Sequence, residues 1–575
     1  MLKSLPETYQ DFTELGWDQI EPHTDALLQR VLSTDTISNW LKDWTQLTCL
    51  ITECFLRLQI RTTTHTNDKD ATSLFLDYSE NIMPNARSFE QKMINKLLDS
   101  GLEPENYSIP IRKMRSDSSI FREKNLPLQT ETESLITTWQ EIEAARVIIW
   151  DGEELPPKQV FDKLAKPERS IRERAIRELY TRAVQDRKAI DEIWVKLIDL
   201  RSEIANNAGF DDFRSYQWQK LARFDYSPED CLSFQKAIQE IIVPVVSRLR
   251  NKHKERLGVE TLRVWDDHWF IRPDSSGLSP LIPFQTIDEL SERIEKIFTN
   301  VAPSFGEYYR IMVDEGLLDL DTRKHKAPGA YMEELPASKY PFVFSSATNT
   351  SGDVSTLLHE GGHAFHMLEA VHWPFHYQSS LNHMPVEFVE VGSMAMELLA
   401  YPYLTSDQGG FYSEEDAARA KIEHLEIILG FFPYMAVVDA FQHWVYENLN
   451  EARDTTKCDE VWAKIHQQYL PHLDWTGIED TLKFGWRLQG HIFFSPFYYV
   501  EYGLAQLGAI QIWENAQIDQ EKAVRAYRKA LALGNTASLP DLFKAAGAKF
   551  AFDAGTLKRA VDLVEKTIFE LEQTD

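Results

Sequence analysis

Helical periodicity is the feature that most limits how this 575-residue chain can fold. Apolar residues recur three and four positions apart in long segments that end at Pro, Gly, Asn or Asp. Strand signals are few, and the two best candidates are residues 145–155 and 339–348. The sequence therefore predicts a mainly α fold with a small β element. The predicted helical segments are 22–61, 160–205, 228–255, 286–315, 411–450, 458–470, 498–515 and 520–534.

Domain boundaries are weakly marked, and no repeat of 20–50 residues is visible. Residues 105–130 are the most irregular stretch in the first third of the chain. We expect a helical N-terminal lobe over residues 1–190, followed by a catalytic region over residues 191–575.

Charge and cysteine content limit the classes of partner and the compartment. The formal net charge of −28 opposes binding to nucleic-acid phosphate and anionic lipid. Four cysteines without a Cys-x-x-Cys pair are too few for a disulfide framework. The first residues have no apolar signal region, and no apolar stretch reaches the length of a membrane span. We expect a cytoplasmic protein with no nucleic-acid or membrane partner.

The segment DVSTLLHEGGHAFHMLEA, residues 353–370, carries the most specific chemistry. Its apolar positions fit a helix, and His359 and His363 lie four apart, on one face, where two imidazoles can bind one Zn²⁺. Glu360 follows the first histidine and can take a proton from water at the metal. His-Glu-x-x-His alone has only three fixed positions, so a third ligand is needed to support the assignment.

A second helix, predicted in MPVEFVEVGSMAMELLA (384–400), supplies carboxylates among apolar neighbours. Glu387, Glu390 and Glu397 are the candidates, and a catalytic zinc keeps three protein ligands and one open position. Glu390 lies 27 residues beyond His363, which leaves room for a loop and a returning helix. Glu397 is two turns further on, where it could orient a zinc-binding histidine.

Two further features flank these ligands. Gly361 and Gly362 each cost about 1 kcal/mol of helix propensity relative to Ala, which indicates tight packing at that point. His366, three residues after His363, is expected near the site without being a ligand.

Taken together, these motifs resemble the M3 peptidases, in particular the oligoendopeptidase F branch. The resemblance rests on HEGGHAFH and EFVEVGSMAMEL. It extends to RVWDDHWF (263–270), HKAPGAY (325–331), FVFSSATNTSGDVSTLLHE (342–360) and GHIFFSPFYYVEYGLAQLGA (490–509). The motifs that carry the resemblance cover much of the C-terminal half, and none of them comes from the N-terminal third.

The resemblance implies a bowl-like, multi-helix zincin that binds one zinc ion per chain. His359, His363 and Glu390 would be the ligands, and Glu360 the base. Substrates would be oligopeptides short enough to enter a channel.

The family also stabilises the oxyanion with a C-terminal histidine and tyrosines. Tyr499 and Tyr502 fit the tyrosine spacing, and His491 fits if one intervening residue is deleted. A phenol or an imidazole N–H can donate to a developing oxyanion. A strand containing Phe342, Val343 and Phe344 would bind the peptide backbone as an added strand.

The resulting hypothesis is a zinc endopeptidase of short oligopeptides. One alternative is a zinc carboxypeptidase with the same motif, in which a cation such as Arg487 would hold the free carboxylate. A second is a catalytically silent peptide-binding protein, which the intact Glu360 argues against. Aminopeptidases of the gluzincin type place a glutamate about 19 residues after the second histidine, and here that position is Asn382.

Overall fold

The structure is a computed structural model that describes residue 6 and residues 8–268 and 279–573. The last two residues of RVWDDHWF lie outside these ranges. The chain forms two compact units, each built from three segments. Unit 1 contains residues 1–118, 281–417 and 505–550, and unit 2 contains residues 119–280, 418–504 and 551–575. Residue 190 lies inside helix α10 (Arg187–Ala208) of unit 2, and the division into lobes 1–190 and 191–575 stays a prediction.

Unit 1 begins with a group of helices packed around the long helix α3 (Ile37–Thr64). Its core includes the tilted pair Trp40 and Trp44, whose ring centroids are 5.1 Å apart. The predicted helix over 22–61 is two helices, because the chain leaves helical geometry at Arg30. The others in this group are α1 (Tyr9–Thr13), α2 (Trp17–Gln29), α4 (Lys69–Asn81), α5 (Met83–Ser100) and α6 (Ser108–Ile120).

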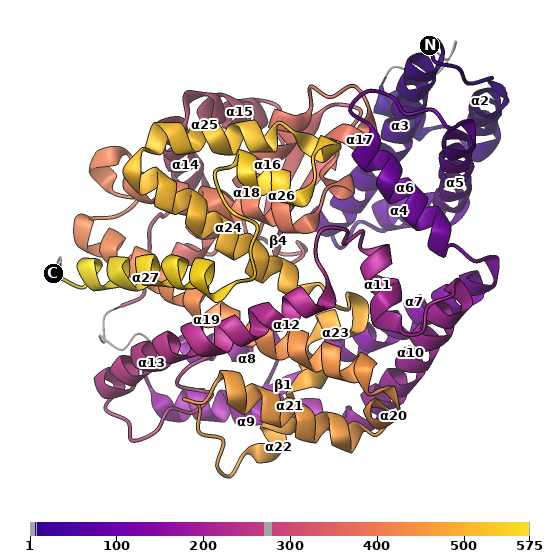
Figure 1. The fold of residues 1–575 in the computed structure, drawn as a ribbon. Coiled ribbons are helices and arrows are strands. Elements are labelled where there is room, and N and C mark those ends of the chain that lie inside the picture. The colour runs from indigo at the N-terminus through magenta and orange to yellow at the C-terminus, as the bar shows by residue number, and fades with distance from the viewer. Residues whose placement is uncertain (1–5, 7, 269–278, 574–575) are drawn as a thin grey trace. The chain divides into compact units, whose positions relative to one another are not determined.

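The middle of unit 1 holds a three-stranded sheet and the helices that carry the histidine motif (Figure 1). The strands are β3 (Leu318–Asp319), β4 (Ala330–Leu335) and β5 (Tyr340–Ser345). The helices are α14 (Ile287–Val301), α15 (Pro303–Asp314), α16 (Ser351–Ala370), α17 (His376–Ser379), α18 (Val386–Leu399), α25 (Gln520–Leu531) and α26 (Leu539–Ala545). Helix α16 packs on β4, β5 and α18, so the expected β element beside the motif helix is confirmed.

The order of the strands corrects one expectation. β5 is the central strand: it is parallel to β3 and antiparallel to β4, and the N–H of Val343 donates to Leu317 at 2.9 Å. Phe342, Val343 and Phe344 therefore already pair within the sheet, and β5 has no free edge for a peptide. The outer strands of this sheet are β3 and β4, and β4, whose Met332 is opposite Val343, is the longer of the two.

The described part of unit 2 is helical apart from a two-stranded hairpin, β1 (Ile148–Trp150) and β2 (Glu153–Leu155). Its long helices are α7 (Leu126–Ala144), α9 (Arg169–Val184), α10, α13 (Val243–Leu257), α19 (Glu414–Glu447), α21 (Thr455–Tyr469) and α27 (Ala554–Leu571). Its shorter helices are α8 (Pro157–Phe161), α11 (Phe213–Lys220), α12 (Pro228–Ala237), α20 (Leu449–Ala452), α22 (Glu479–Phe484) and α23 (Gly490–Phe494). Helix α24 (Tyr499–Ile518) starts in unit 2 and ends in unit 1. The predicted mainly α fold is confirmed.

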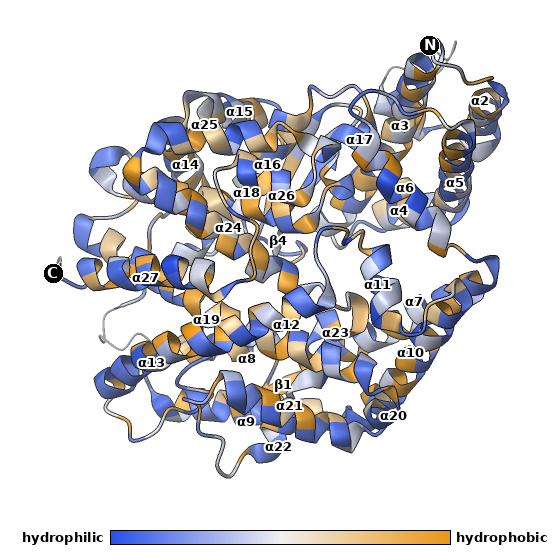
Figure 2. Ribbon diagram, viewed as in Figure 1, coloured by the Kyte–Doolittle hydropathy of each residue, from blue (hydrophilic) through white to orange (hydrophobic). Residues whose placement is uncertain are grey.

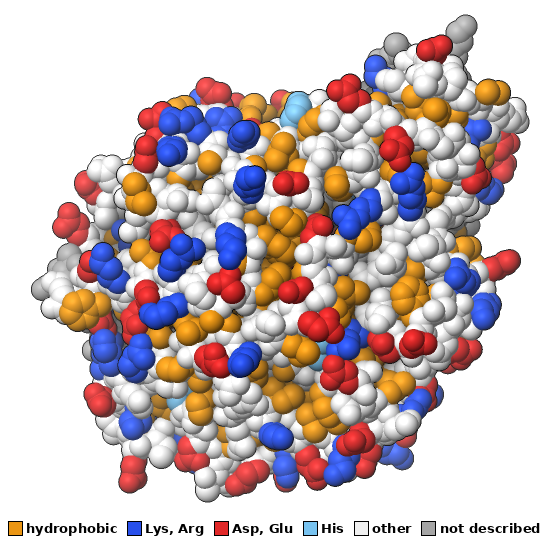
Figure 3. Space-filling model, in the orientation of Figure 1, with side chains coloured by type: hydrophobic (Ala, Val, Ile, Leu, Met, Phe, Trp, Pro, Cys, Tyr) orange, Lys and Arg blue, Asp and Glu red, His pale blue; other side chains and the backbone are white. Residues whose placement is uncertain are grey.

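Amphipathic patterning explains why these segments are helices. In α27 the buried residues recur at helical spacing, as in Leu557, Val561, Val564 and Ile568, and Figure 2 shows apolar and polar residues alternating along it. Surface charges of both signs are interspersed on the face seen in Figure 3.

Helix α19 is an exception, because it is apolar enough and long enough to cross a membrane by composition alone. However, 67% of its most apolar window is buried inside the structure. Burial of this kind is that of a core helix, and it accounts for the apolar run without a bilayer.

Candidate metal centre

Helix α16 starts at a capping box. Thr350 is the N-cap, its Oγ1 accepts from the N–H of Asp353, and Asp353 accepts from the N–H of Thr350 in return. These reciprocal bonds satisfy donors that the first helical turn leaves unpaired. The helix then runs without a break through His359 and His363, so both imidazoles are on the same face.

Glycines set how closely α16 approaches its neighbours. A Cβ added to Gly362 would lie 2.6 Å from the Cα of Ser393 and 2.8 Å from the carbonyl oxygen of Gly392, both on α18. A Cβ added to Gly361 would lie 2.4 Å from the ring of Phe298. The tight packing that the two glycines indicated is confirmed, and at Gly362 it is the crossing of α16 with α18.

This crossing brings together three ligand atoms. Nε2 of His359 is 3.5 Å from Oε2 of Glu390, and Nε2 of His363 is 3.8 Å from the same oxygen. A tetrahedral ion with bonds of about 2.0–2.1 Å holds its ligands about 3.3 Å apart, so the set is only slightly wider than the metal requires. His359, His363 and Glu390 thus form a group able to hold one metal ion.

Glu397 forms a hydrogen bond with His359. Its Oε1 lies 2.7 Å from Nδ1 of His359, and because a carboxylate only accepts, Nδ1 is the donor. In the neutral imidazole that a metal ion requires, the lone pair is therefore on Nε2, the atom that faces Glu390. A carboxylate behind a ligating histidine fixes its tautomer and raises its basicity.

Burial changes the proton affinity of two other groups at the site. It lowers the pKa of His363 to about 4, so the imidazole is neutral and has a lone pair for a cation. It raises the pKa of Glu360 to about 7, in the range suited to a general base at neutral pH.

The edge strand of the sheet lies beside that base. The backbone N–H of Met332 in β4 donates to the carboxylate of Glu360. This hydrogen bond opposes the rise in the pKa of Glu360. The outer edge of β4 and Glu360 are therefore neighbours within unit 1. The sequence missed this role for β4 because residues 330–335 contain two glutamates and no alternating apolar pattern.

His366 lies near the group of His359, His363 and Glu390 and is not a member of it, as expected. It is fully buried, and its ring packs against Phe388 of α18 at a centroid distance of 5.8 Å. Gly392 makes room for it, since a Cβ there would lie 3.1 Å from Nδ1 of His366. It serves as a packing residue between the two helices.

The three residues proposed for oxyanion binding lie together in unit 2. The ring of His491 is 4.8 Å from that of Tyr499 and 6.2 Å from that of Tyr502, between centroids. Burial lowers the pKa of His491 to about 4 and raises that of Tyr499 to about 12, so the first is neutral and the second protonated at neutral pH.

Two residues that the sequence did not single out complete this group. The hydroxyl of Tyr434 donates to Oε1 of Gln489 at 2.9 Å, and Nε2 of Gln489 lies 3.2 Å from Nδ1 of His491. Because the amide nitrogen donates, Nδ1 of His491 accepts and the ring proton is on Nε2, where it can be donated elsewhere. No sequence motif marked Tyr434, which lies in the apolar run of α19.

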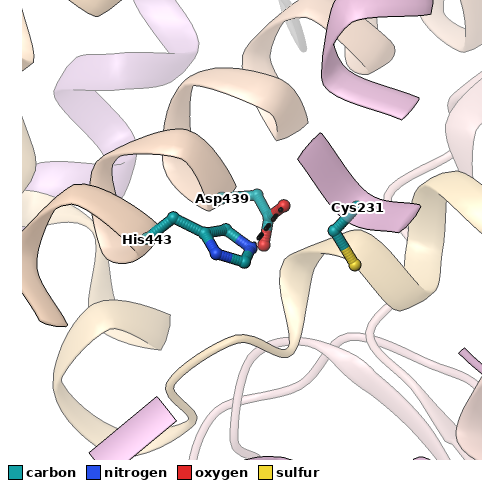
Figure 4. Close-up of side chains that lie close together, drawn as sticks. All are labelled: Cys231, Asp439 and His443. Atoms are coloured by element: carbon teal, nitrogen blue, oxygen red, sulfur yellow. Dashed lines mark ion pairs between the residues drawn. The ribbon is translucent and has the colours of Figure 1, made fainter. Parts of the chain in front are cut away.

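A second group of metal-ligand types, Cys231, Asp439 and His443, is buried in unit 2 (Figure 4). Arg214 lies 3.2 Å from Nδ1 of His443, and since a guanidinium only donates, Nδ1 accepts and the proton is on Nε2. That Nε2 faces Asp439 at 3.6 Å. His443 therefore directs a proton, rather than a lone pair, into the group, which makes it a poorer metal site than the first.

Comparison with known proteins decides the family. The family model for "Peptidase family M3" matches residues 164–561, well over half of the chain. The chain belongs to peptidase family M3. This M3 member has 22% identity over 292 residues to an oligoendopeptidase F homolog of Borreliella burgdorferi, covering 49% of this chain and 45% of the relative. It has 23% identity over 340 residues to oligopeptidase PepF of Bacillus subtilis, covering 58% and 47%.

The M3 chain thus spans about half the length of the curated relatives it matches. Its likeness to a solved structure extends further. A structure of PZ peptidase A with an inhibitor superposes with a TM-score of 0.86 at 27% identity, covering 98% of this chain and 99% of the other. The mainly α architecture of this M3 chain is therefore shared over nearly its whole length.

Proposed function

We propose that this chain is a zinc-dependent endopeptidase that hydrolyses internal bonds of short oligopeptides. The observation that carries the proposal is the convergence of His359, His363 and Glu390 on one point, with the adjacent Glu360 buried beside them. Two nitrogens and one carboxylate oxygen are ligand types that zinc takes in catalytic sites. The names of the matched relatives, an oligoendopeptidase F homolog and an oligopeptidase, support the oligopeptide substrate class.

A zinc ion held by His359, His363 and Glu390 would supply Lewis acidity toward the scissile carbonyl and would make water more acidic. Glu360 accepts the proton of the attacking water and then passes it to the leaving amine. Its buried setting suits both steps, because a pKa of about 7 lets the carboxyl gain and lose a proton near neutral pH. Glu397 keeps His359 in the tautomer that the metal needs.

We propose that the edge of β4, in place of residues 342–344, binds the peptide backbone. An extended peptide adds to a sheet by pairing with unsatisfied N–H and C=O groups, and β4 is the longer of the two outer strands of this sheet and the one beside Glu360. The backbone of Met332, in β4, is hydrogen-bonded to Glu360. A peptide paired with β4 would therefore have its backbone beside the proposed base.

Tyr499, Tyr502 and His491 are proposed to stabilise the oxyanion. Each carries a donor at neutral pH, and for His491 the hydrogen bond from Gln489 directs the ring N–H away from Nδ1. A donor prearranged for the developing charge is among the largest contributions to such a reaction.

The carboxypeptidase alternative has less support. Such an enzyme needs a cation for the free terminal carboxylate, and Arg487 is buried with its guanidinium bound to Asp191 and Asp459. We also propose a cytoplasmic setting, since Cys49, Cys54, Cys231 and Cys458 are all buried and none of the four forms a disulfide. The net charge of −28 argues against nucleic-acid and anionic-lipid partners.

The deciding experiment uses a peptide of about ten residues that is acetylated at one end and amidated at the other. Mass spectrometry of the products should show internal cleavage, lost on chelation and restored by zinc. The same peptide with a free carboxyl end serves as the comparison. Release of single C-terminal residues from the free peptide, with the blocked peptide left intact, would favour a carboxypeptidase and contradict the proposal.

A further inference from the structure

The pairing pattern of the sheet in unit 1 shows which backbone groups of β4 face outward. The N–H of Val343 donates to Leu317, next to β3, and so it points away from β4. Met332, opposite Val343, is therefore in a non-hydrogen-bonded pair, and its own N–H and C=O point to the outer edge. The hydrogen bond from Met332 to Glu360 agrees with this direction. Because such pairs alternate along a ladder, the backbone of Glu333 points inward, toward β5.

The side chains of β4 alternate between the two faces of the sheet. Met332 packs against the cluster that contains Met367 of α16. Tyr331 is on the opposite face, where its hydroxyl lies 2.5 Å from Oγ1 of Thr63 in α3. Glu333 shares the face of Tyr331, so its carboxylate is on the side of the sheet that α3 covers.

The two neighbouring glutamates of β4 differ in their bonding. Glu334, on the α16 face, is buried and accepts from Oγ of Ser380 at 2.5 Å and from the N–H of Leu381 at 3.0 Å. The side chain of Glu333 is partly exposed, and among the described residues no hydrogen bond or ion pair reaches its oxygens. Glu333 therefore presents an accessible carboxylate on the strand proposed to bind the peptide.

The cations nearest to this face of the sheet are paired with other carboxylates. Arg57 of α3 pairs with Glu53 at 2.9 Å. Lys326 pairs with Asp319 at 2.7 Å. The charge of Glu333 is thus left for a group from outside the chain.

The proton affinity of Glu333 reflects this unbalanced setting. Burial and the negative charge of Glu334 raise the pKa of Glu333 to about 7. A cation placed close by would have the reverse effect, because it favours the ionised carboxylate. A peptide that brings a positive charge to this face would therefore gain an ion pair.

The register of an added strand determines which peptide side chain reaches Glu333. In an antiparallel pairing, residues whose backbones point away from the partner strand form the closer pairs, with Cα atoms about 4.5 Å apart. Their side chains lie on the same face of the sheet and contact each other. The peptide residue opposite Glu333 would thus place its side chain beside the carboxylate, on the α3 face.

We infer that Glu333 selects peptides with a lysine or arginine at the position opposite it on the edge of β4. The inference rests on the proposed peptidase function. Because Met332 is hydrogen-bonded to Glu360, the selected residue is the neighbour of the peptide residue that lies beside the base. An ammonium or guanidinium group there would form a charge-assisted hydrogen bond with Glu333. This ion pair would help to determine which bonds of an oligopeptide are cut.

The test moves one residue through an end-blocked, otherwise uncharged peptide, one position at a time on both sides of the cleaved bond. Lysine, norleucine and glutamate are compared at each position, since norleucine keeps the aliphatic stem of lysine without its charge. At one position, kcat/KM should be about 3- to 10-fold higher for lysine than for norleucine, and lowest for glutamate. Equal values for lysine and norleucine at every position would overturn the inference.

Two further outcomes would also contradict it. An equal gain from lysine at all positions would indicate general attraction to a chain of net charge −28. A preference that appears only when the peptide has a free amino end would assign the carboxylate to that terminus, and not to a side chain.

Two substitutions at Glu333 test the residue itself. Glu333→Gln keeps the shape of the side chain and should reduce the lysine-to-norleucine ratio at the selected position to about 1. Glu333→Lys should reverse the order, so that the glutamate peptide is cut faster than the lysine peptide. Retention of the wild-type order in both variants would exclude Glu333.

Glu292→Gln is the matched control. Glu292 is exposed on α14 of the same unit, outside the sheet, and its substitution removes one negative charge as Glu333→Gln does. We expect the lysine preference to persist in this variant. An equal decrease of the ratio in Glu292→Gln and Glu333→Gln would show that net charge, and not the position of Glu333, is the cause.

A binding measurement separates this inference from the proposed function. The Glu360→Gln enzyme should bind the intact lysine peptide about 3- to 10-fold more tightly than the norleucine peptide, by calorimetry. Cleavage without preference for lysine would reject the role of Glu333 alone. Preferential binding of the lysine peptide by a wild-type chain that cuts nothing would reject the peptidase function alone.

Discussion

Nδ1 of His359 donates to Glu397 across 2.7 Å, joining two residues that are 38 positions apart in the chain. Glu397→Ala should lower zinc affinity about 10- to 100-fold, because the imidazole loses the partner that fixes its tautomer and basicity. Competition with a chromogenic chelator measures the affinity. Activity should return in excess zinc, and unchanged affinity would contradict the orienting role.

Glu360→Gln should separate metal binding from chemistry. The amide keeps the shape of the side chain and cannot accept the proton of water, whereas His359, His363 and Glu390 remain as ligands. We expect zinc content near that of the wild type and loss of nearly all turnover. His359→Ala is the companion variant and should lose both zinc and activity. Full activity in Glu360→Gln would exclude it as the base.

Gly362→Ala should disturb the metal site from a position that is not a ligand. The added Cβ would meet the backbone of Ser393 and Gly392, forcing α16 and α18 apart, and overpacking of this kind costs about 1–3 kcal/mol. We expect a lower melting temperature and weaker zinc binding. Gly352→Ala in the same helix is the control, since its Cβ would come no closer than 3.5 Å to Thr350. Similar behaviour of both variants would count against the crossing as the cause.

Tyr499→Phe and Tyr502→Phe test the oxyanion proposal. If one of these hydroxyls donates to the oxyanion, its removal should lower kcat by about 10²–10³ while zinc content and melting temperature stay unchanged. Parallel measurement of bound zinc shows that any loss is chemical. If neither change alters kcat, oxyanion support must come from His491 or from the metal alone.

Acidification should remove the stability that neutral buried histidines contribute, even without metal, whereas buried carboxyls such as Glu143 and Glu333, whose pKa values burial raises to about 6 and about 7, act in the opposite direction. Burial lowers the pKa of His268, His376 and His491 to about 4 and that of His466 to about 3, below the value of about 6.5 in an unfolded chain. Between those values the unfolded state binds more protons, so stability is lost as pH falls from about 6.5 toward 4. Each ring contributes up to about 1.4 kcal/mol per pH unit.

Thermal melting of the chelated protein at pH 7, 6 and 5 measures this loss, and chelation excludes metal release as the cause. His491→Gln removes one of the titrating rings, so its melting temperature should fall less than that of the wild type, or rise more, between pH 7 and 5. The same change in melting temperature for both proteins would contradict the prediction.

The sequence by itself determined the local features of this protein. Helical periodicity follows from how one segment must bury an apolar face, so the mainly α fold could be predicted. Spacing within one helix also placed His359, Glu360 and His363 correctly relative to one another, because residues four apart always share a face. The EFVEVGSMAMEL motif pointed to Glu390 and Glu397 before any crossing was known.

Only the tertiary structure decided which distant segments meet. The order of the strands placed β5 in the centre and β4 at the edge, and strand order depends on packing that the alternation of residues within one strand does not encode. The same holds for Gln489 and Tyr434 beside His491, which come from separate helices. Units 1 and 2 each combine three separate segments, because cores are assembled by contact in space and not by position in the chain.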